Sequence, residues 1–315
     1  MKTMKVIDWD QVHKLADYPR LVEALTGMYR EGCDAMDRMI MRQPDKDGVA
    51  SDFLMQPAWI RGRAFGIKIA NVFPSNERKG LPTIVGSYLL FDGNTGEPLA
   101  YIDGTAETFV KTAANSAVAS KLLAREDAAV MLMLGAGRLA PYLIGAHSAV
   151  RPIKRVMIWN RTAAKAHAIA ERLARPGYQV TAVADPAAAA READLISCAT
   201  FAPEPILNGA WLKPGVHVDL VGSHRADLRE SDDEVMRRGG RLYVDARFST
   251  VTISGDVIEP LKSGALAERD IADLFELAQG KQPGRRGRDD ITVFKSGGGG
   301  HEDLAAALML YRLAG

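Results

Sequence analysis

Residues 128–140 combine an apolar run with glycines at a spacing that suits phosphate binding. The run Val130-Met-Leu-Met-Leu134 leads into Gly135-Ala136-Gly137-Arg138-Leu139-Ala140, which matches the pattern Gly-x-Gly-x-x-Ala. Glycine lets a backbone approach a pyrophosphate closely, and the N-terminus of the helix that should follow favours negative charge. We therefore expect residues 135–139 to bind the pyrophosphate of a dinucleotide.

A second apolar run, residues 156–159, is expected to form the second strand of a βαβ dinucleotide-binding unit. The residues at the end of that strand contact the ribose of the dinucleotide. It is followed by Asn160-Arg161-Thr162, with no acidic residue. A carboxylate there would bond the 2′-hydroxyl of NAD, whereas a guanidinium and two short polar groups suit the 2′-phosphate of NADP. The sequence predicts NADPH as the cofactor, with NADH as a weaker alternative. The competing interpretation is that Thr162 only caps a helix from Ala163 and that Arg161 is solvated.

Two lysines are candidates for holding a second anion. In Phe65-Gly-Ile-Lys-Ile-Ala70 the alternation of a strand puts Lys68 on the face opposite Ile67 and Ile69, between two small residues. Lys111 and Thr112 are expected near the start of a helix over 108–120, where the helix dipole and free amides favour an anion. The alternative for both lysines is a solvent-facing side chain without a ligand.

The elements that must position these residues fall into two groups. Strand patterns at 130–134, 156–160, 179–183, 194–200, 217–221 and 241–245 alternate with alanine-rich helical stretches, which predicts a doubly wound α/β domain. The first 120 residues instead show a helix over 18–32 and several β-like runs separated by turns, which indicates a separate domain. Residues 291–315 have no obvious place in a six-stranded nucleotide sheet, so we expect them to return to the first domain.

Composition narrows the class of partner. The 315 residues are 47% hydrophobic and 25% charged with a formal net charge of +1, which favours small-molecule partners over nucleic acid. The sequence lacks a signal-peptide pattern and a run long enough to span a membrane, and it has only Cys33 and Cys198, so we expect a cytoplasmic protein. No metal-ligand pattern is present, and no metal is predicted.

Several motifs at compatible spacings make the chain resemble the ornithine cyclodeaminase/mu-crystallin family. They are Met55-Gln-Pro-Ala58, the strand around Lys68, Phe73-Pro-Ser-Asn, Gly80-Leu-Pro-Thr83, Lys111-Thr-Ala-Ala, the glycine turn, Cys198-Ala-Thr200, Val221-Gly-Ser223, Phe294-Lys-Ser296 and Asp303-Leu-Ala-Ala306. The resemblance implies a Rossmann domain inserted in an α+β substrate-binding and dimerisation domain, and a homodimer. The expected division is 1–122 for the first part of the substrate domain, 123–290 for the NADP-binding domain and 291–315 for the returning segment.

The resemblance also assigns roles to residues. In the family an arginine and the strand lysine hold the substrate carboxylate, which maps to Arg38 and Lys68, with Arg42 as the alternative to Arg38. Lys111 stands where the family usually has an arginine, so it keeps the charge but loses the bidentate fork. Thr83 is expected near the nicotinamide, and Ser296 and Gly297 near cofactor and substrate. The remaining cofactor contacts implied are Lys111, Thr112, Gly135, Ala136, Gly137, Arg138, Leu139, Asn160, Arg161, Thr162, Cys198, Ala199, Thr200, Val221 and Ser223.

Two differences between this sequence and the cyclodeaminases of the family favour one of the family's activities. The catalytic aspartate of the cyclodeaminases is replaced by His224, and the acidic NAD signature is replaced by Asn160-Arg161-Thr162. Both favour an NADPH-dependent reductase of cyclic ketimines with a 2-carboxylate, Δ1-pyrroline-2-carboxylate or Δ1-piperideine-2-carboxylate, with His224 or solvent as the proton source. The alternatives are an ornithine cyclodeaminase, an amino-acid dehydrogenase or N-alkyl amino acid synthase, and a binding protein that holds NADPH and a small ligand without turnover.

Overall fold

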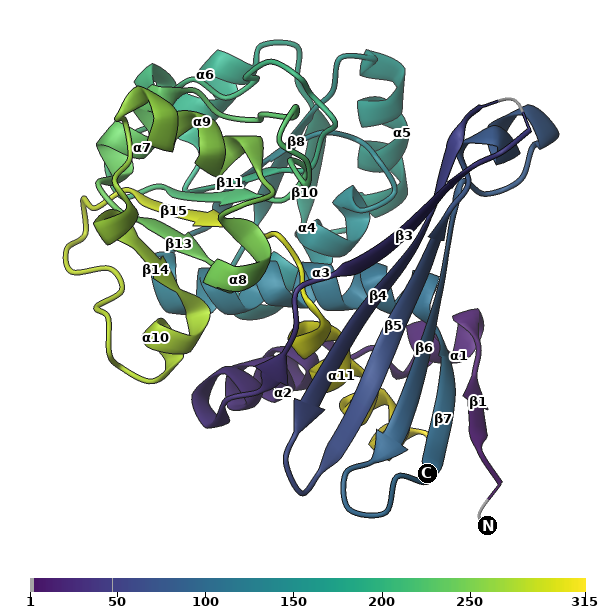
Figure 1. The fold of residues 1–315 in the computed structure, drawn as a ribbon. Coiled ribbons are helices and arrows are strands. Elements are labelled where there is room, and N and C mark those ends of the chain that lie inside the picture. Colours follow the sequence, from purple (N-terminus) through teal and green to yellow (C-terminus); the bar gives the residue numbers. More distant parts are fainter. Residues whose placement is uncertain (1–2, 47) are drawn as a thin grey trace. The chain divides into compact units, whose positions relative to one another are not determined.

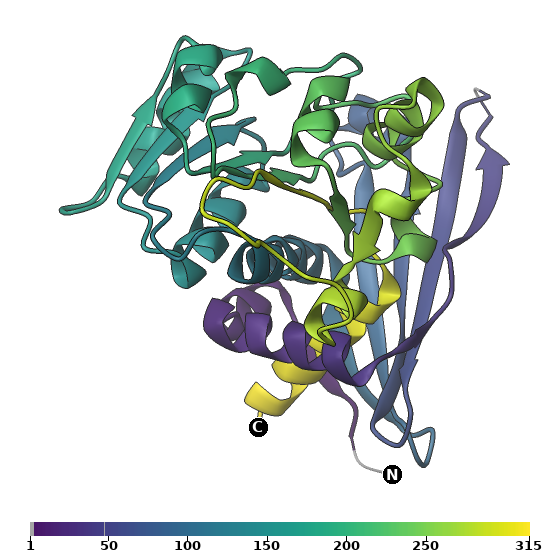
Figure 2. The ribbon, with the colours of Figure 1, turned by 90° about the vertical axis from the view of Figure 1, so that its left-hand side faces the viewer.

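The computed structural model describes residues 3–46 and 48–315, which form two compact units (Figure 1 and Figure 2). The first unit comprises residues 1–112 and 299–315, and the second comprises residues 113–298. A unit inserted within the first one is the organisation expected from the sequence, but the chain divides at 112 and 298, whereas the sequence analysis placed the boundaries at 122 and 290.

The first unit is built on a sheet that, among the described residues, has seven strands in the order β1-β7-β6-β5-β4-β2, with β3 paired to β4. β1 runs parallel to β7, and all other pairs are antiparallel. The strands are β1 (Lys5–Ile7), β2 (Asp34–Ala35), β3 (Met39–Pro44), β4 (Ala50–Ile60), β5 (Ala64–Val72), β6 (Ile84–Asp92) and β7 (Pro98–Asp103).

Helix α11 (Gly300–Leu313) forms the core of the first unit, where it packs on β4, β5, β6 and α2 (Figure 1). Its first eleven residues, 300–310, are all buried, including His301, whose ring contacts Tyr29. The prediction of a helix over 18–32 is confirmed by α2 (Tyr18–Glu31), which starts at an Asp17 cap. The other helices of this unit are α1 (Trp9–Leu15) and the 3-10 helix η1 (Pro74–Lys79).

The second unit confirms the predicted doubly wound α/β fold. Its eight described strands are all parallel, in the order β10-β9-β8-β11-β12-β15-β13-β14, and the direction of winding reverses between β8 and β11. The strands are β8 (Val130–Leu134), β9 (Arg155–Trp159), β10 (Gln179–Ala182), β11 (Leu195–Cys198), β12 (His217–Leu220), β13 (Leu242–Val244), β14 (Ile271–Asp273) and β15 (Thr292–Lys295).

β15 is the element that moves the domain boundary. The whole of 291–315 was predicted to return to the first domain, yet β15 lies between β12 and β13 in the sheet of the second unit. All four of its residues are buried, and a buried strand needs hydrogen-bonded neighbours on both edges. Only the segment from Gly299 onward belongs to the first unit.

Helices cover both faces of the second sheet. The long helix α3 (Gly104–Leu123) begins in the first unit and continues into the second. The others are α4 (Ala140–Val150), α5 (Ala163–Leu173), α6 (Pro186–Glu192), α7 (Asp233–Gly239), α8 (Arg247–Thr250), α9 (Gly255–Ser263), α10 (Leu274–Ala278) and the 3-10 helices η2 (Gly209–Trp211) and η3 (Glu268–Asp270). Across the described part of the chain, no helix combines the length and apolar character that crossing a membrane requires.

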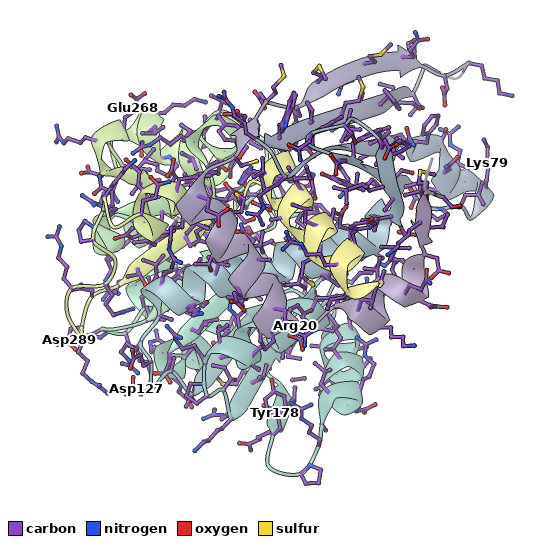
Figure 3. The ribbon with its side chains drawn as sticks, turned by 90° about the horizontal axis from the view of Figure 1, so that it is seen from below. Arg20, Lys79, Asp127, Tyr178, Glu268 and Asp289 are labelled. Carbon is purple, nitrogen blue, oxygen red and sulfur yellow. The ribbon has the colours of Figure 1, made fainter. Side chains whose placement is uncertain are left out.

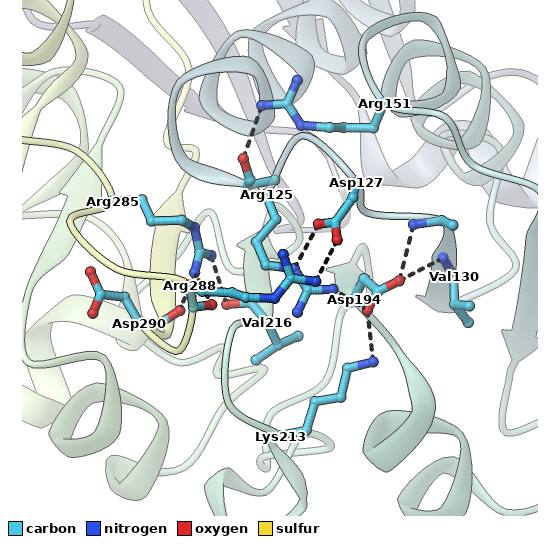
Figure 4. A network of polar contacts seen from close by, with 12 residues as sticks. Arg125, Asp127, Val130, Arg151, Asp194, Lys213, Val216, Arg285, Arg288 and Asp290 are labelled. Carbon is cyan, nitrogen blue, oxygen red and sulfur yellow. Dashed lines mark hydrogen bonds and ion pairs between the residues drawn. The ribbon is translucent and has the colours of Figure 1, made fainter.

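A charged network closes the amino-terminal edge of the second sheet (Figure 4). Asp194 accepts hydrogen bonds from the amides of Ala129 and Val130 and pairs with Arg125 at 2.8 Å and Lys213 at 2.7 Å. Nearby, Asp127 pairs with Arg288, and Figure 3 shows Asp127 and Asp289 at the periphery of this unit. Ligands of doubly wound sheets bind at the opposite, carboxyl edge, so we assign this network to stability.

Candidate functional site

Two lysines and three carboxylates are buried together in the first unit, and we call Lys68, Lys111, Glu107, Glu302 and Asp303 the lysine–carboxylate cluster. β5 supplies Lys68, α3 supplies Glu107 and Lys111, and α11 supplies the last two. The Lys68 Nζ lies 3.2 Å from Asp303 and 3.5 Å from Glu107, and it donates to the Thr108 hydroxyl at 2.6 Å. The Lys111 Nζ lies 2.9 Å from Glu302 and 3.3 Å from Asp303, so Asp303 joins the two lysines.

Burial and charge act on the cluster in opposite directions. Burial raises the pKa of Glu107 to about 8, although Lys68 opposes the shift, so this carboxyl is protonated at neutral pH. Burial also works against ionisation of Asp303, but Lys111 and Lys68 outweigh it and lower the pKa of that carboxyl. In the same way Asp303 and Glu302 overcome the burial of Lys111 and raise its pKa. At neutral pH the cluster therefore contains an ionised Asp303 beside a charged Lys111, together with a protonated Glu107.

The lysines form the more accessible end of the cluster. The side chains of Lys68 and Lys111 are 5% and 6% exposed, whereas Glu107 and Glu302 are fully buried. Ammonium groups form charge-assisted hydrogen bonds with carboxylates, which is the contact that a carboxylate ligand would also need. The 4% exposure of Lys68 contradicts the alternative of a solvent-facing strand lysine, and Lys68 stays a candidate for binding a carboxylate.

Lys111 and Thr112 do not lie at the start of a helix. The sequence analysis placed them near a helix start, where free amides attract anions, but α3 begins at Gly104 and both residues lie beyond its first turn. The dipole effect is confined to that turn. Lys111 is therefore held by its two carboxylate partners, and its position follows from the spacing of Glu107 and Lys111, which are one turn apart on α3.

The structure distinguishes between the two candidate arginines. Arg42 on β3 makes a bidentate pair with Asp52 on the neighbouring β4, at 2.6 and 2.8 Å, which occupies its guanidinium. Arg38 precedes β3 and is half-buried, with its amide bonded to the Asp37 carboxylate. Arg38, the residue to which the family resemblance first maps the substrate arginine, is the candidate we retain. Thr83 is exposed just before β6, and its carbonyl accepts from the Phe73 amide.

The glycine turn lies where the sequence placed it, between β8 and α4. Gly135 has φ of 109°, and a Cβ on it would lie 2.5 Å from the Ala199 carbonyl oxygen, so the turn needs glycine there. A Cβ on Gly137 would meet no atom of the described residues within 4 Å, which leaves room for a ligand against this backbone. Leu139 is the N-cap of α4 and gives its amides no side-chain bond. These features fit a pyrophosphate held by residues 135–139.

The segment after β9 is built around Asn160. Its Oδ1 accepts from the Ala136 amide at 3.1 Å, and its Nδ2 donates to the Thr162 carbonyl at 3.0 Å, so it links the glycine turn to the start of α5. Arg161 and Thr162 are exposed, and Thr162 makes no side-chain capping bond although α5 begins at Ala163. The capping interpretation therefore does not explain Thr162, and the exposed pair remains a candidate for the 2′-phosphate.

Two expected cofactor contacts turn their side chains inward. Cys198 is fully buried at the end of β11, and burial raises the pKa of its thiol, so packing rather than reactivity explains it. Ser223 is also fully buried, and its hydroxyl bonds the Leu228 carbonyl. The neighbouring Ala199, Thr200 and Val221 still follow the carboxyl ends of β11 and β12, where a dinucleotide binds.

His224 and Gly297 stand at two further loops of the second unit. His224 is exposed and packs edge-on against Phe201, with Nδ1 3.0 Å from the Gly222 carbonyl. Because a carbonyl only accepts, Nδ1 carries the hydrogen and Nε2 is the nitrogen that can take up a further proton. The amides of Gly297 and Gly298 donate to Asp245 at 2.7 and 2.6 Å, so the first half of the glycine run that follows Ser296 is anchored.

One constellation looks catalytic but cannot meet a substrate. Ser120 contacts His147 Nδ1 at 2.8 Å, and His147 Nε2 lies 3.1 Å from Asp219, the order of a nucleophile, base and carboxylate. All three side chains are fully buried. Ser197 also bonds Asp219, which completes a hydrogen-bonded network inside the core.

Sequence reasoning missed the carboxylates. Glu107 could have been found from its spacing four residues before Lys111 on a helix. Asp303 belongs to a motif that carried the family resemblance but was given no role, and Glu302 lies beside it. Glu230, described below, lies in a loop with no local pattern, so only the fold brings it to the sheet edge.

Comparisons with known proteins identify the family of this chain. A model of the ornithine cyclodeaminase/mu-crystallin family matches residues 4–314. The chain is 42% identical over 262 residues to a Δ1-pyrroline-2-carboxylate reductase of Paracoccus denitrificans, covering 82% of this chain and 83% of that protein. It is 34% identical over 309 residues to a protein of the same name from Colwellia psychrerythraea, covering 96% of this chain and 97% of that one.

A solved structure extends the comparison to three dimensions. It is the Δ1-pyrroline-2-carboxylate reductase of Thermococcus litoralis in complex with NADH and L-proline, which is 31% identical and matches with a TM-score of 0.90 over 99% of this chain and 97% of that chain. The match of the family model to nearly the whole sequence confirms the resemblance drawn from the motifs. The chain belongs to the ornithine cyclodeaminase/mu-crystallin family.

Proposed function

We propose that this protein is an oxidoreductase that reduces a cyclic ketimine carrying a 2-carboxylate, converting Δ1-pyrroline-2-carboxylate to L-proline or Δ1-piperideine-2-carboxylate to L-pipecolate. The observation that carries the proposal is the lysine–carboxylate cluster, whose two ammonium groups lie in front of buried carboxylates and suit an anionic ligand. The relatives named Δ1-pyrroline-2-carboxylate reductase support the choice of a cyclic imine as substrate.

In this proposal Lys68 and Arg38 hold the substrate carboxylate, and Lys111 adds to the anchor. Fixing the carboxylate fixes the adjacent C2 atom, and such positioning can contribute about 7–11 kcal/mol in favourable intramolecular systems. The imine nitrogen must gain a proton as its double bond is reduced. The proton comes from solvent or from His224, whose Nε2 can carry one.

The cofactor in this proposal is NADPH, which supplies the hydride when bound. Residues 135–139 would hold its pyrophosphate, because Gly137 leaves room and the amides of α4 have no side-chain cap. Arg161 and Thr162 would hold the 2′-phosphate, because both are exposed and no carboxylate follows β9 to bond a ribose hydroxyl. NADH remains the weaker alternative. The solved structure of the Thermococcus litoralis protein, by contrast, is a complex with NADH.

The test is the oxidation of reduced nicotinamide, followed by absorbance, with each of the two cyclic imines and with NADPH and NADH in parallel. Pyruvate with methylamine and ornithine with NAD serve as further arms. We expect rapid NADPH-dependent loss with a cyclic imine. A faster rate with pyruvate and methylamine would replace the proposal by an open-chain imine reductase, and ammonia release from ornithine would replace it by cyclodeamination.

We also propose that two copies of the chain associate through the exposed strand β3 and its neighbour β4. All of β3 is exposed, and Met41 is 59% exposed beside its cross-strand partner Phe53, with Met39 on the same face. An exposed apolar edge strand of this kind usually marks an interface. Light scattering should show a dimer for the wild type and a monomer for Met41→Asp, with Lys79→Asp as the control. A monomeric wild type would contradict this.

A cytoplasmic location stays a prediction from composition. Both cysteines, Cys33 and Cys198, are free thiols in the structure, and a reducing compartment would keep them so.

A further inference from the structure

The loops that follow β8, β11 and β12 are packed backbone against backbone. A Cβ on Gly222 would lie 2.0 Å from the carbonyl oxygen and 2.3 Å from the amide nitrogen of Thr200, so even alanine cannot fit there. On the other side, the Ala199 amide donates to the Leu134 carbonyl at 2.9 Å, and Gly135 approaches Ala199 closely. The three loops thus form one continuous edge, next to the point where the sheet reverses its winding.

A single buried carboxylate joins two of these loops. Glu230 Oε1 accepts from the Thr200 amide at 2.7 Å and from its hydroxyl at 2.9 Å, while Oε2 accepts from the Gly222 amide at 2.6 Å. Glu230 is fully buried, and its own amide donates to Asp256 at 3.0 Å. Its carbonyl accepts from the Ile206 and Leu207 amides. The backbone of Glu230 is therefore fixed by hydrogen bonds, and its side chain bonds both loops.

We infer that Glu230 is a positioning residue for cofactor binding: it fixes Thr200 and Gly222 in the arrangement that the dinucleotide contacts, without touching the dinucleotide itself. The inference rests on the proposed function for the identity of the ligand. Backbone amides of loops bind a ligand strongly only when they are already in place, because ordering them on binding costs free energy. A carboxylate is suited to this task, since it accepts at both oxygens and its hydrogen bonds to amides are charge-assisted.

The ionisation state of Glu230 offers a readout that a purely structural role would not give. Burial raises the pKa of Glu230 to about 7, Lys295 on β15 lowers it and Asp256 on α9 raises it. The ionised form accepts all three hydrogen bonds. A protonated oxygen would instead point a hydrogen at an amide or hydroxyl donor, so at least one bond is lost. Cofactor affinity should therefore fall as the pH drops below about 7.

The experiment measures the Kd of NADH by nicotinamide fluorescence for the full-length protein between pH 5.5 and 8.5. NADH is the probe because it lacks the 2′-phosphate, which titrates in this range. We expect Glu230→Gln to weaken NADH binding about tenfold or more at pH 8, because the amide nitrogen of glutamine cannot accept from Gly222 or Thr200. Its Kd should be nearly independent of pH, whereas the wild-type Kd should rise as pH falls.

Two further variants separate positioning from folding. Thr200→Val removes only the hydroxyl donor and should weaken NADH binding by about threefold to tenfold in a folded protein. Glu234→Gln is the matched control, because Glu234 lies four residues away on α7 and is 45% exposed, with an ion pair at 3.7 Å to Arg237. Its Kd and pH profile should match those of the wild type.

Unchanged NADH affinity in Glu230→Gln, or equal pH profiles in that variant and the wild type, would overturn the inference. If Glu230→Gln does not fold, the wild-type pH profile and Thr200→Val decide: either a flat profile or normal NADH binding by Thr200→Val overturns the inference. Imine turnover is a separate readout. A wild type that binds NADH but reduces no imine refutes the proposed substrate and leaves the Glu230 test intact. If the wild type binds NADPH but not NADH, the same variants are titrated with NADPH, and a wild type that binds neither overturns both proposals.

Discussion

Replacement of Lys68 by methionine should remove turnover and destabilise the fold for different reasons. Lys68 is 4% exposed and lies 3.2 Å from Asp303, so its loss leaves the cluster with Lys111 against three carboxyls. Breaking one side of a buried ion pair costs about 3–5 kcal/mol of the free energy of unfolding. Losing the ammonium that faces the substrate carboxylate should cost about 2–5 kcal/mol, or about 30-fold to 4,000-fold in kcat/KM.

A second substitution separates the two effects. In Lys68→Met with Asp303→Asn, the cluster loses one cation and one anion, so its formal charge balance returns to that of the wild type. We expect this double variant to recover most of the free energy of unfolding, since the Asp303 carboxylate no longer needs a partner. Its turnover should stay low, because the substrate anchor is still missing.

The assay compares chemical denaturation with steady-state kinetics for the wild type, both single variants and the double variant. NADPH affinity, measured by fluorescence in the absence of imine, should remain within about threefold of the wild type in every folded variant. If the double variant regains turnover together with stability, Lys68 serves only as the counter-charge of Asp303. Turnover by Lys68→Met near the wild-type level would refute the anchor directly.

Two further predictions concern the second unit. Arg161→Ala should weaken NADPH about 10-fold to 100-fold and NADH less than about threefold, because only NADPH carries the 2′-phosphate; equal losses in Kd would remove the argument for Arg161. Burial lowers the pKa of His217 to about 3. Below about pH 6.5 the unfolded state therefore binds a proton that the folded state does not bind, so the free energy of unfolding decreases as pH falls. Between pH 7.5 and 5.5 the wild type should lose about 1.4 kcal/mol of its free energy of unfolding that His217→Gln does not lose, as denaturant titrations at the two pH values would show.

The second unit was largely predictable because its signals are local. Each buried strand is an apolar run, and the glycine turn directly follows the first of them. The apolar runs and their spacing therefore predicted where β8, β9, β10, β11 and β12 lie along the chain. β15 was misplaced because strand order is a property of pairing and not of sequence. Its four residues resemble any short apolar segment, and nothing before them in the chain indicates that they enter between β12 and β13.

The site was predictable only in part, for a related reason. Lys68 could be singled out because its strand alternates and its neighbours are small. Its partner Asp303 is 235 residues away on α11, and Glu230 reaches Thr200 from 30 residues along the chain. Acidic residues at such separations carry no periodic signal. The helix start of α3 was also placed too late, and a four-residue error there was enough to give Lys111 the wrong physical role.

The charge balance of the lysine–carboxylate cluster makes its affinity for anions depend on pH. Glu107 is protonated at neutral pH, but above about pH 8 it ionises and adds a negative charge beside Lys68, which opposes the binding of a ligand carboxylate. Pyrrole-2-carboxylate is a suitable probe, because it has the five-membered ring and 2-carboxylate of the proposed imine and no group that titrates in this range. Its binding should weaken by up to about tenfold per pH unit above pH 8. Glu107→Gln cannot ionise at this position and should abolish the dependence. A flat wild-type profile, or an equal slope in the variant, would show that Glu107 does not control the anion site.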